Sequence, residues 1–281
     1  MNKFVGVDIG GTKMMLVAEH EGEWIEHRTP TGHDRCTLAG LKEELDRFLD
    51  RLPYEPDGVG IGLVGLVAGT DRVAFSDMKA LDGATAAYFS DGRFPVRLLN
   101  DVKAATMAEA AHYPDARTLA VIMAGTGVAM GVVADGKLLG GASGWSGELG
   151  YTMFPTDAGT QKLDHLAGGA AILRQAGMDV ETFLASLERG DEKAEGIIDR
   201  AGYYFGLTLT NVLHLYNPDR IVIGGSAASY KGYLDKALAV AQELTLKEHW
   251  AACTIVPARD PRRIVALGAR EFARRLAAEP S

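Results

Sequence analysis

Two short glycine turns, each between apolar strand segments, constrain the fold of this chain more than any other feature. The first is Gly10-Gly11-Thr12, which separates the apolar segments 4–8 and 13–19, and the second is Gly125-Thr126-Gly127, between 119–123 and 128–134. Glycine lets a backbone approach another group closely, and consecutive N–H groups in such a turn form a concavity that binds anions. We therefore predict one strand hairpin in each half of the chain, each with a turn suited to phosphate.

The remaining pattern predicts an α/β fold with two lobes. A chain of 281 residues is long enough for two lobes of about 100–150 residues each. We expect an N-terminal lobe at 1–117 and a C-terminal lobe at 118–265, with a helix in 266–281 that packs back onto the first lobe. The other predicted elements are strands at 23–28, 59–67, 96–99 and 220–223, and helices at 38–52, 101–111, 162–176, 198–216, 230–248 and 266–278.

Charge and cysteine content exclude several classes of protein. The chain has 29 Lys and Arg against 37 Asp and Glu, a net charge of −8, which argues against a partner held by its phosphates, such as nucleic acid. Cys36 and Cys253 are too few for a disulfide framework, so we expect free thiols in a reducing compartment. The uncharged stretch 118–134 is rich in glycine and fits a buried hairpin better than a membrane span. We expect a cytoplasmic protein without a membrane partner.

Asp8 ends the first predicted apolar strand, and only Ile9 separates it from the glycine turn. A carboxylate there is costly unless it has a function, and it suits Mg²⁺ bound to a nucleotide polyphosphate. Thr12 adds a hydroxyl donor and Lys13 a positive charge. The alternative is a hairpin turn that needs glycine only for its conformation, and this alternative weighs more for the turn at 125–127.

Two further segments place polar or flexible residues after apolar strands. Asn100 and Asp101 follow 96–99, at the strand end where ligands bind in open α/β sheets. Asp101 there could accept a proton from a substrate hydroxyl that Asn100 binds, or the pair could only cap the next helix. Gly224-Gly225 suits the edge of an adenosine pocket, or a tight strand-to-helix turn.

Two motif matches are set aside. The segment 60–65 reads G-x-G-x-x-G, but no helix follows it, and the dinucleotide-binding fingerprint needs that helix. The seven histidines lack metal-ligand spacing, and His165 is expected on a helix surface.

Taken together, these residues resemble the ROK family of bacterial sugar kinases, within the actin/hexokinase/Hsp70 ATPase superfamily. The segments that carry the resemblance follow the family's order: DIGGTK at 8–13, VGIGLVGLV at 59–67, LLNDVKAATMAE at 98–109, MAGTGVAMGVVADGKLLGGASGWSGELGY at 123–151 and NVLHLYNPDRIVIGGS at 211–226. The resemblance implies a two-lobed actin-like ATPase (ribonuclease H-like) fold with an active-site cleft between the lobes, and a homodimer.

The resemblance also implies a role for each matching residue. Asp101 would be the general base, and Asp8 would serve Mg²⁺. Sugar-binding positions would be Gly65, Asn100, Glu148, Tyr151 and Asp164. ATP would be framed by Gly10, Gly11, Thr12, Lys13, Gly125, Thr126, Gly127, Gly224 and Gly225.

Three departures from the family pattern alter these expectations. The family's E-x-G-H segment is Glu148-Leu149-Gly150-Tyr151 here, and its cysteine-rich zinc segment is replaced by 156–164, which lacks cysteine. Asp164 stands at the glutamate that ends that segment, and Lys103 replaces the asparagine two residues after the base. We therefore expect no zinc, and a sugar pocket in which glucose is a poor substrate and a sugar substituted differently at C1 or C2 is preferred.

The sequence thus predicts an ATP-dependent kinase for a hexose or amino sugar. The alternative is a sugar sensor of the same fold with weak or no catalysis, although Asp8 and Asp101 are both retained. A kinase that uses polyphosphate, or acts on a non-sugar alcohol, also stays open.

Overall fold

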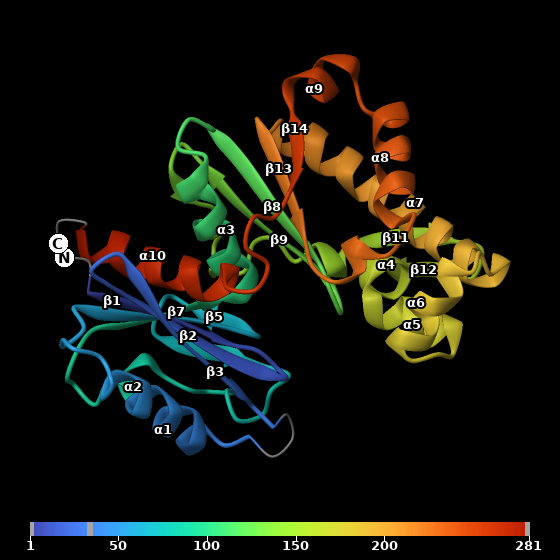
Figure 1. The fold of residues 1–281 in the computed structure, drawn as a ribbon. Helices are drawn as coiled ribbons and strands as arrows, with labels where there is room; N and C mark the ends of the chain where they lie inside the picture. The colour runs from blue at the N-terminus through green and yellow to red at the C-terminus, as the bar shows by residue number, and fades with distance from the viewer. Residues whose placement is uncertain (1–2, 33–35, 279–281) are drawn as a thin grey trace. The chain divides into compact units, whose positions relative to one another are not determined.

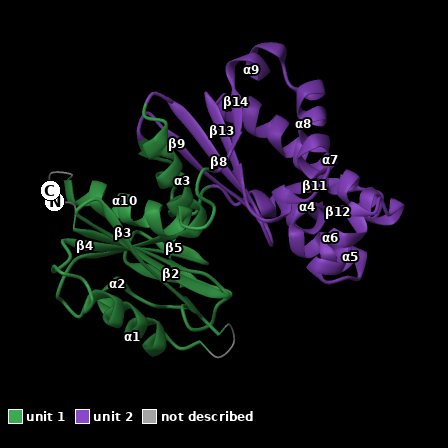
Figure 2. Cartoon of the chain, viewed as in Figure 1, with its two compact units in different colours: residues 1–114, 137–146, 259–281 green, residues 115–136, 147–258 purple. Residues whose placement is uncertain are grey.

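The computed structural model describes residues 3–32 and 36–278, which form two compact units (Figures 1 and 2). Unit 1 takes its residues from Met1–Pro114, Lys137–Ser146 and Arg259–Ser281, and unit 2 from Asp115–Gly136 and Gly147–Ala258. The chain therefore enters unit 1 three times. Residues 279–281 of the predicted C-terminal helix segment lie outside the described residues.

Unit 1 is built on a five-stranded sheet with the order β3-β2-β1-β4-β7. Its strands are β1 (Phe4–Ile9), β2 (Lys13–His20), β3 (Glu23–Pro30), β4 (Gly58–Leu63) and β7 (Val96–Asn100), with a separate hairpin of β5 (Leu66–Ala68) and β6 (Arg72–Phe75) and a short β10 (Lys137–Leu138). Its helices are α1 (Leu38–Leu49), α2 (Ala86–Ser90), α3 (Asp101–His112) and α10 (Ile264–Ala278). β1 runs antiparallel to β2 and parallel to β4, and β4 runs parallel to β7.

The two faces of this sheet are covered differently (Figure 1). Large side chains of the central strands, such as Val7 and Leu16, pack with Leu45 and Phe48 of α1 in one core. On the opposite face α10 packs against the sheet, with Ala266 beside Met15 and Val17.

Glycines let α10 lie directly on the sheet backbone. A β-carbon on Gly6 of β1 would lie 1.9 Å from the carbonyl oxygen of Ala266, and one on Gly60 of β4 would lie 1.8 Å from that of Ala269. Gly60 and Gly62, which match the dinucleotide motif by spacing, thus serve the packing of this helix.

Unit 2 contains a sheet in which β9, β8, β13 and β14 are neighbours in that order. Its strands are β8 (Thr118–Ala124), β9 (Val128–Ala134), β13 (Arg220–Gly224) and β14 (Thr254–Pro257), with a separate hairpin of β11 (Met153–Thr156) and β12 (Gly159–Lys162). Its helices are α4 (Leu163–Ala167), α5 (Gly169–Ala176), α6 (Val180–Glu188), α7 (Glu192–Tyr216), α8 (Tyr233–Leu244) and α9 (Lys247–Ala252), with 3-10 turns η2 (Leu149–Tyr151) and η3 (Ala227–Ser229).

The core of unit 2 lies between its sheet and the long helix α7. Ile122 and Ile223 of the sheet pack in one cluster with Phe205 and Leu209 of α7, and Tyr233 of α8 joins it with its hydroxyl on the carbonyl of Ala167, at 2.9 Å. Aspartate caps α7 at Asp191, and the helix ends at Asn217, which has a left-handed backbone conformation.

Three predicted elements are interrupted in the structure. The strand predicted at 59–67 ends at Leu63 and resumes as β5, because Gly65 turns the chain with φ +134°. The helix predicted at 162–176 is split at Gly168 into α4 and α5, and the one at 230–248 is split at Thr245 into α8 and α9. Among the described residues, no helix has both the length and the apolar character needed to cross a membrane.

Candidate active site

The parallel strands β1, β4 and β7 bring the predicted catalytic residues of unit 1 to one edge of its sheet. Ile9 lies opposite Leu63, and Leu63 lies opposite Asn100, so the three carboxyl-terminal strand ends are level. Asp8 precedes Ile9 and Asp101 follows Asn100. The register therefore gathers these two carboxylates beyond the same edge.

Asp8 and Asp101 interact electrostatically. Burial and, to a smaller extent, the charge of Asp101 raise the pKa of Asp8 from 3.8 to about 7, while the Lys13 ammonium acts in the opposite direction. Asp101 is the first residue of α3, where the helix dipole favours a negative charge. Two carboxylates that repel each other form a place where a cation would relieve the repulsion.

Asn100 joins two segments at this edge. Its Oδ1 accepts hydrogen bonds from the N–H groups of Val102 at 3.0 Å and Lys103 at 3.4 Å, so Asn100 is the N-cap of α3. Its Nδ2 donates to the carbonyl of Gly65 at 3.0 Å. Gly65 cannot carry a side chain, because a β-carbon there would lie 2.4 Å from the carbonyl oxygen of Phe75.

In the first glycine turn the carbonyl groups are held by Thr31. The Thr31 hydroxyl lies 3.1 Å from the carbonyl oxygen of Gly10 and 2.9 Å from that of Gly11, and the Thr31 N–H donates to Thr12 at 3.2 Å. Within the described residues, no hydrogen bond occupies the N–H groups of Gly11 and Thr12. These two donors are therefore available to a ligand, as those of an anion-binding turn must be.

The second glycine turn, in unit 2, is held in a similar way by a helix. The N–H groups of Gly169 and Ala170, at the start of α5, donate to the carbonyls of Gly125 at 2.8 Å and Thr126 at 3.0 Å. In the part of the chain that the structure describes, the N–H groups of Thr126 and Gly127 again have no hydrogen-bond partner. In both predicted phosphate-binding turns, hydrogen bonds from other segments therefore hold the carbonyl groups, and two N–H groups are left without a partner among the described residues.

Asp164 of α4 holds the second turn in place from the other side. Its Oδ1 accepts the N–H of Val128 at 2.7 Å, directly after the turn. Its carboxylate fills the space beside Gly127 and Gly150, where added β-carbons would lie 2.9 Å and 2.2 Å from Oδ1. Asp164 thus connects α4, the turn and η2, and Glu148 lies exposed immediately before η2.

Tyr151 and Lys162 close the base of the hairpin that replaces the cysteine-rich segment. The Lys162 Nζ lies 3.8 Å from the centre of the Tyr151 ring, which is 59 % exposed. β11 and β12 pair over four residues each, from Met153 opposite Lys162 to Thr156 opposite Gly159. Backbone pairing and a cation–π contact hold this segment. Across residues 3–32 and 36–278, no three His, Cys, Asp or Glu side chains gather in a group that could hold a metal ion.

Gly224 and Gly225 lie at the end of β13, beside the second turn. Gly225 has φ +96°, and a β-carbon there would lie 2.3 Å from the carbonyl oxygen of Ala124. The 3-10 turn η3 follows these glycines, and the helix predicted from residue 230 begins at Tyr233 as α8. In unit 2, Asp164 and Gly225 therefore lie beside the turn at 124–128, and in unit 1 Asp8, Asn100 and Asp101 lie at the ends of β1 and β7.

Sequence reasoning noted Lys103 only as a departure from the family pattern, and it missed the other residues that position these groups. The Lys103 ammonium is buried and donates to the carbonyl of Gly144, and the Trp145 Nε1 donates to the carbonyl of Val67 at 3.1 Å. These contacts hold the glycine-rich segment of Lys137–Ser146 against α3 and β5 within unit 1. Thr31 and Gly169 also act through contacts distant in the sequence, so local patterns gave no signal for them.

Comparisons with known proteins place this chain in a family. The family model described as "ROK family" matches residues 4–275. The chain is 30% identical over 270 residues to an N-acetyl-D-glucosamine kinase of Escherichia fergusonii, a match that covers 81% of this chain and 85% of that protein. It is 28% identical to an N-acetylmannosamine kinase of Vibrio vulnificus, covering 84% of this chain and 87% of the relative.

A solved structure of similar fold is the ROK hexokinase from Thermus thermophilus. The two chains are 25% identical, each is covered to 99%, and the TM-score is 0.82. The mixed α/β fold is thus the two-lobed actin-like ATPase fold that the sequence predicted. With the family match spanning nearly all of its residues, this chain belongs to the ROK family.

Proposed function

We propose that the protein is an ATP-dependent sugar kinase, with Asp101 as the general base toward a sugar hydroxyl. Relatives that match most of its length are named as kinases of N-acetylated amino sugars. The observation that carries the proposal is the pair Asp8 and Asp101, electrostatically coupled at one sheet edge. The turn beside them has two N–H groups that make no hydrogen bond to any described residue. A phosphate-binding turn, a cation-binding carboxylate and a base are the parts that phosphoryl transfer needs.

In this proposal Asp101 accepts the proton of the attacking hydroxyl. Asn100 caps α3 and so holds the first turn of the helix in place, which keeps the Asp101 carboxylate oriented. The helix N-terminus stabilises the carboxylate as an anion, ready to take a proton. Phosphoryl transfer asks little covalent chemistry of the protein, so the positioning of the reacting groups supplies most of the rate enhancement.

The nucleotide phosphates would bind to the N–H groups of the two glycine turns, at Gly11-Thr12 and Thr126-Gly127, with Lys13 adding positive charge. Asp8 fits Mg²⁺, because oxygen donors from one or two carboxylates, completed by water and phosphate, are what this ion takes. When bound, the ion neutralises phosphate charge. Asp8 would hold the ion in its ionised form. The raised pKa of Asp8 disfavours that form only while no cation is near, because a bound cation stabilises the carboxylate.

For the sugar we propose a hexose that carries a substituent at C2, such as an N-acetylamino group. Glu148, Tyr151 and Asp164 are the residues proposed to lie along the sugar. Asp164 commits one oxygen to the N–H of Val128, which leaves the other for a ligand, and the exposed ring of Tyr151 offers an apolar surface. A flat ring beside an acetyl group favours a substituted sugar over glucose.

The first test measures turnover of glucose, mannose, fructose, N-acetylglucosamine and N-acetylmannosamine. With ATP it is followed by coupled ADP release, and with polyphosphate by formation of the sugar phosphate. We expect turnover with ATP and the highest kcat/KM for an N-acetylhexosamine. Turnover with glucose at about 10⁴ M⁻¹s⁻¹ or more, equal to that of the amino sugars, would contradict the proposed pocket.

The second test replaces the base. D101N keeps the shape of the side chain and the N-cap at Asn100, and should lower kcat by about 10²–10⁴-fold while sugar and ATP still bind by calorimetry. D82N removes an exposed aspartate of the same unit and should leave kcat unchanged. Sugar binding without turnover in the wild-type protein would identify a sensor instead of a kinase.

A further inference from the structure

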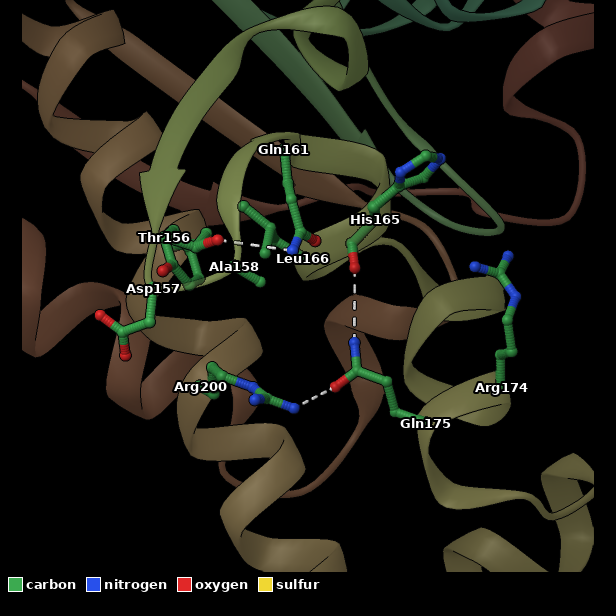
Figure 3. A pocket seen from close by; sticks show the side chains of 10 residues that line it. Thr156, Asp157, Ala158, Gln161, His165, Leu166, Arg174, Gln175 and Arg200 are labelled. Carbon is green, nitrogen blue, oxygen red and sulfur yellow. Dashed lines mark hydrogen bonds between the residues drawn. The ribbon is translucent and has the colours of Figure 1, made fainter.

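A hollow in unit 2, apart from the residues assigned above, is lined by cations (Figure 3). Its volume is about 460 Å³, and the hairpin β11–β12, α4, α5 and α7 surround it. That volume falls within the range of pockets that take small molecules. Leu166 and Tyr204 contribute apolar surface, while the other groups that line the hollow are mostly polar or charged.

Two arginines face this hollow without a carboxylate partner. Neither Arg174 of α5 nor Arg200 of α7 forms an ion pair within the described residues. Some other arginines do have carboxylate partners, such as Arg263 with Glu26 and Arg270 with Glu19. In a chain of net charge −8, two unpaired guanidinium groups at one hollow are a local excess of positive charge, opposed by Asp157 alone among the lining residues.

One of these arginines is already held in place. Arg200 donates to Oε1 of Gln175, and Nε2 of Gln175 donates to the carbonyl of His165 at 3.4 Å, as the dashed lines in Figure 3 show. On the opposite wall Nε2 of Gln161 donates to the Thr156 hydroxyl at 3.4 Å. Because these donors are partly ordered before a ligand arrives, binding costs less side-chain entropy.

We propose that this hollow binds a small phosphorylated metabolite, a phosphomonoester on a ring the size of a hexose. The planar guanidinium fork matches the oxygens of a phosphate, and Arg174 and Arg200 approach from different helices. Leu166 and Tyr204 offer a surface for the ring. The proposal rests on no catalytic role, so it holds or fails independently of the kinase activity.

Ligand binding here would act on the same short helix as the sugar side. Asp164 holds Val128 after the second glycine turn, and the next two residues of α4, His165 and Leu166, line the hollow. A ligand in contact with α4 and β12 would restrict the movement of both. We expect slower amide exchange in the segment 153–167 when the hollow is filled.

The test is calorimetric titration of the full protein with glucose 6-phosphate, inorganic phosphate and glucose. The variant R174Q/R200Q removes both cations, and the matched control R189Q/K193Q removes two exposed cations, at the C-cap of α6 and on α7, that do not line the hollow. We expect the wild type and the control to bind glucose 6-phosphate, and the affinity of R174Q/R200Q to be lower by about tenfold or more. Inorganic phosphate should bind more weakly, and added glucose should not displace the sugar phosphate from this hollow.

Three results would overturn the proposal. One is equal affinity of R174Q/R200Q and the control for glucose 6-phosphate. Another is no heat of binding for the wild type at concentrations well above about 1 mM. The third is equal affinity for inorganic phosphate and glucose 6-phosphate, which would show that the sugar ring contributes nothing to binding. Thermal unfolding by circular dichroism checks that both variants fold, and exposed positions such as these tolerate glutamine.

Discussion

Substituting Gly268 by alanine should separate two helices that now touch. Gly268 lies buried in α10, and a β-carbon there would lie 1.6 Å from the carbonyl oxygen of Ala104 in α3, where ordinary contact begins at 3.4 Å. The helices must therefore move apart by about 1.8 Å, because backbone atoms on both sides cannot rotate away. On its other side α10 is in contact with Gly6 and Gly60, so any movement also disturbs its packing on the sheet.

The magnitude follows from two opposing effects. Alanine favours a helix over glycine by up to about 1 kcal/mol, but overpacking a rigid interface costs about 1–3 kcal/mol and sometimes more. A clash at 1.6 Å with backbone calls for the upper end of the overpacking range, so after the helix gain we expect G268A to lower the free energy of unfolding by about 2 kcal/mol. Because α3 begins at Asp101, a displacement of about 1 Å at that carboxylate should also lower kcat by about 10²-fold.

The matched control is Gly196 of α7, where an added β-carbon would meet no atom within 4 Å. G196A should therefore raise the free energy of unfolding by about 0.5–1 kcal/mol. Urea unfolding followed by circular dichroism measures both variants, and kcat is measured at a temperature at which each is folded. A free energy of unfolding for G268A equal to or above that of the wild type would refute the packing argument.

Three further substitutions test the site and its supports. D8N should raise the free energy of unfolding at pH 8, without Mg²⁺ or nucleotide, by up to about 4 kcal/mol. Because the pKa of Asp8 is raised from 3.8 to about 7, this gain in stability should fade as the pH falls from 7 to 4 in urea titrations, and a gain independent of pH would contradict the burial of the Asp8 charge. T31V removes the hydroxyl that holds the carbonyls of Gly10 and Gly11 and should raise the KM for ATP by about tenfold, whereas T31S keeps the hydroxyl and should have the wild-type KM. Equal KM values for T31V and T31S would argue against a role of this turn in ATP binding. E109A should lower the free energy of unfolding by about 1–3 kcal/mol, because the N–H of Arg259, now bonded to Glu109 at 2.8 Å, loses its buried acceptor. E109Q retains an acceptor and should lose less, so thermal unfolding in which both variants lose the same stability would count against this role.

The parts of the fold that rest on local signals were predictable from the sequence. Both glycine-turn hairpins form as expected, as β1–β2 and β8–β9. Each is predictable because the two apolar strands and the glycine turn follow one another directly in the sequence. The end of α7 was also predictable, since Asn217 precedes a proline and adopts a left-handed conformation readily. The fold class followed from the order of such segments.

The interruptions and the supports of the site depend on contacts between distant residues. α5 begins at Gly169 because its first N–H groups bind carbonyls of the turn at 125–126, and no pattern within 162–176 reveals those acceptors. The hairpin β11–β12 pairs only four residues on each strand, too few for a clear alternation. The capping role of Asn100 was one of two readings that the sequence left open, and the structure shows the cap directly.

The three-part path of the chain through unit 1 has a consequence for biosynthesis. The sheet face at Gly6 and Gly60 is covered by α10, whose residues, Ile264–Ala278, are synthesised last among those described here. Unit 2 is complete in the nascent chain by Ala258, so it is free to fold on the ribosome while the first strands of the protein wait with an uncovered sheet face. During that interval β1 and β4 are the segments most exposed to chaperones and to aggregation, and a premature stop codon before α10 would leave them in that state permanently.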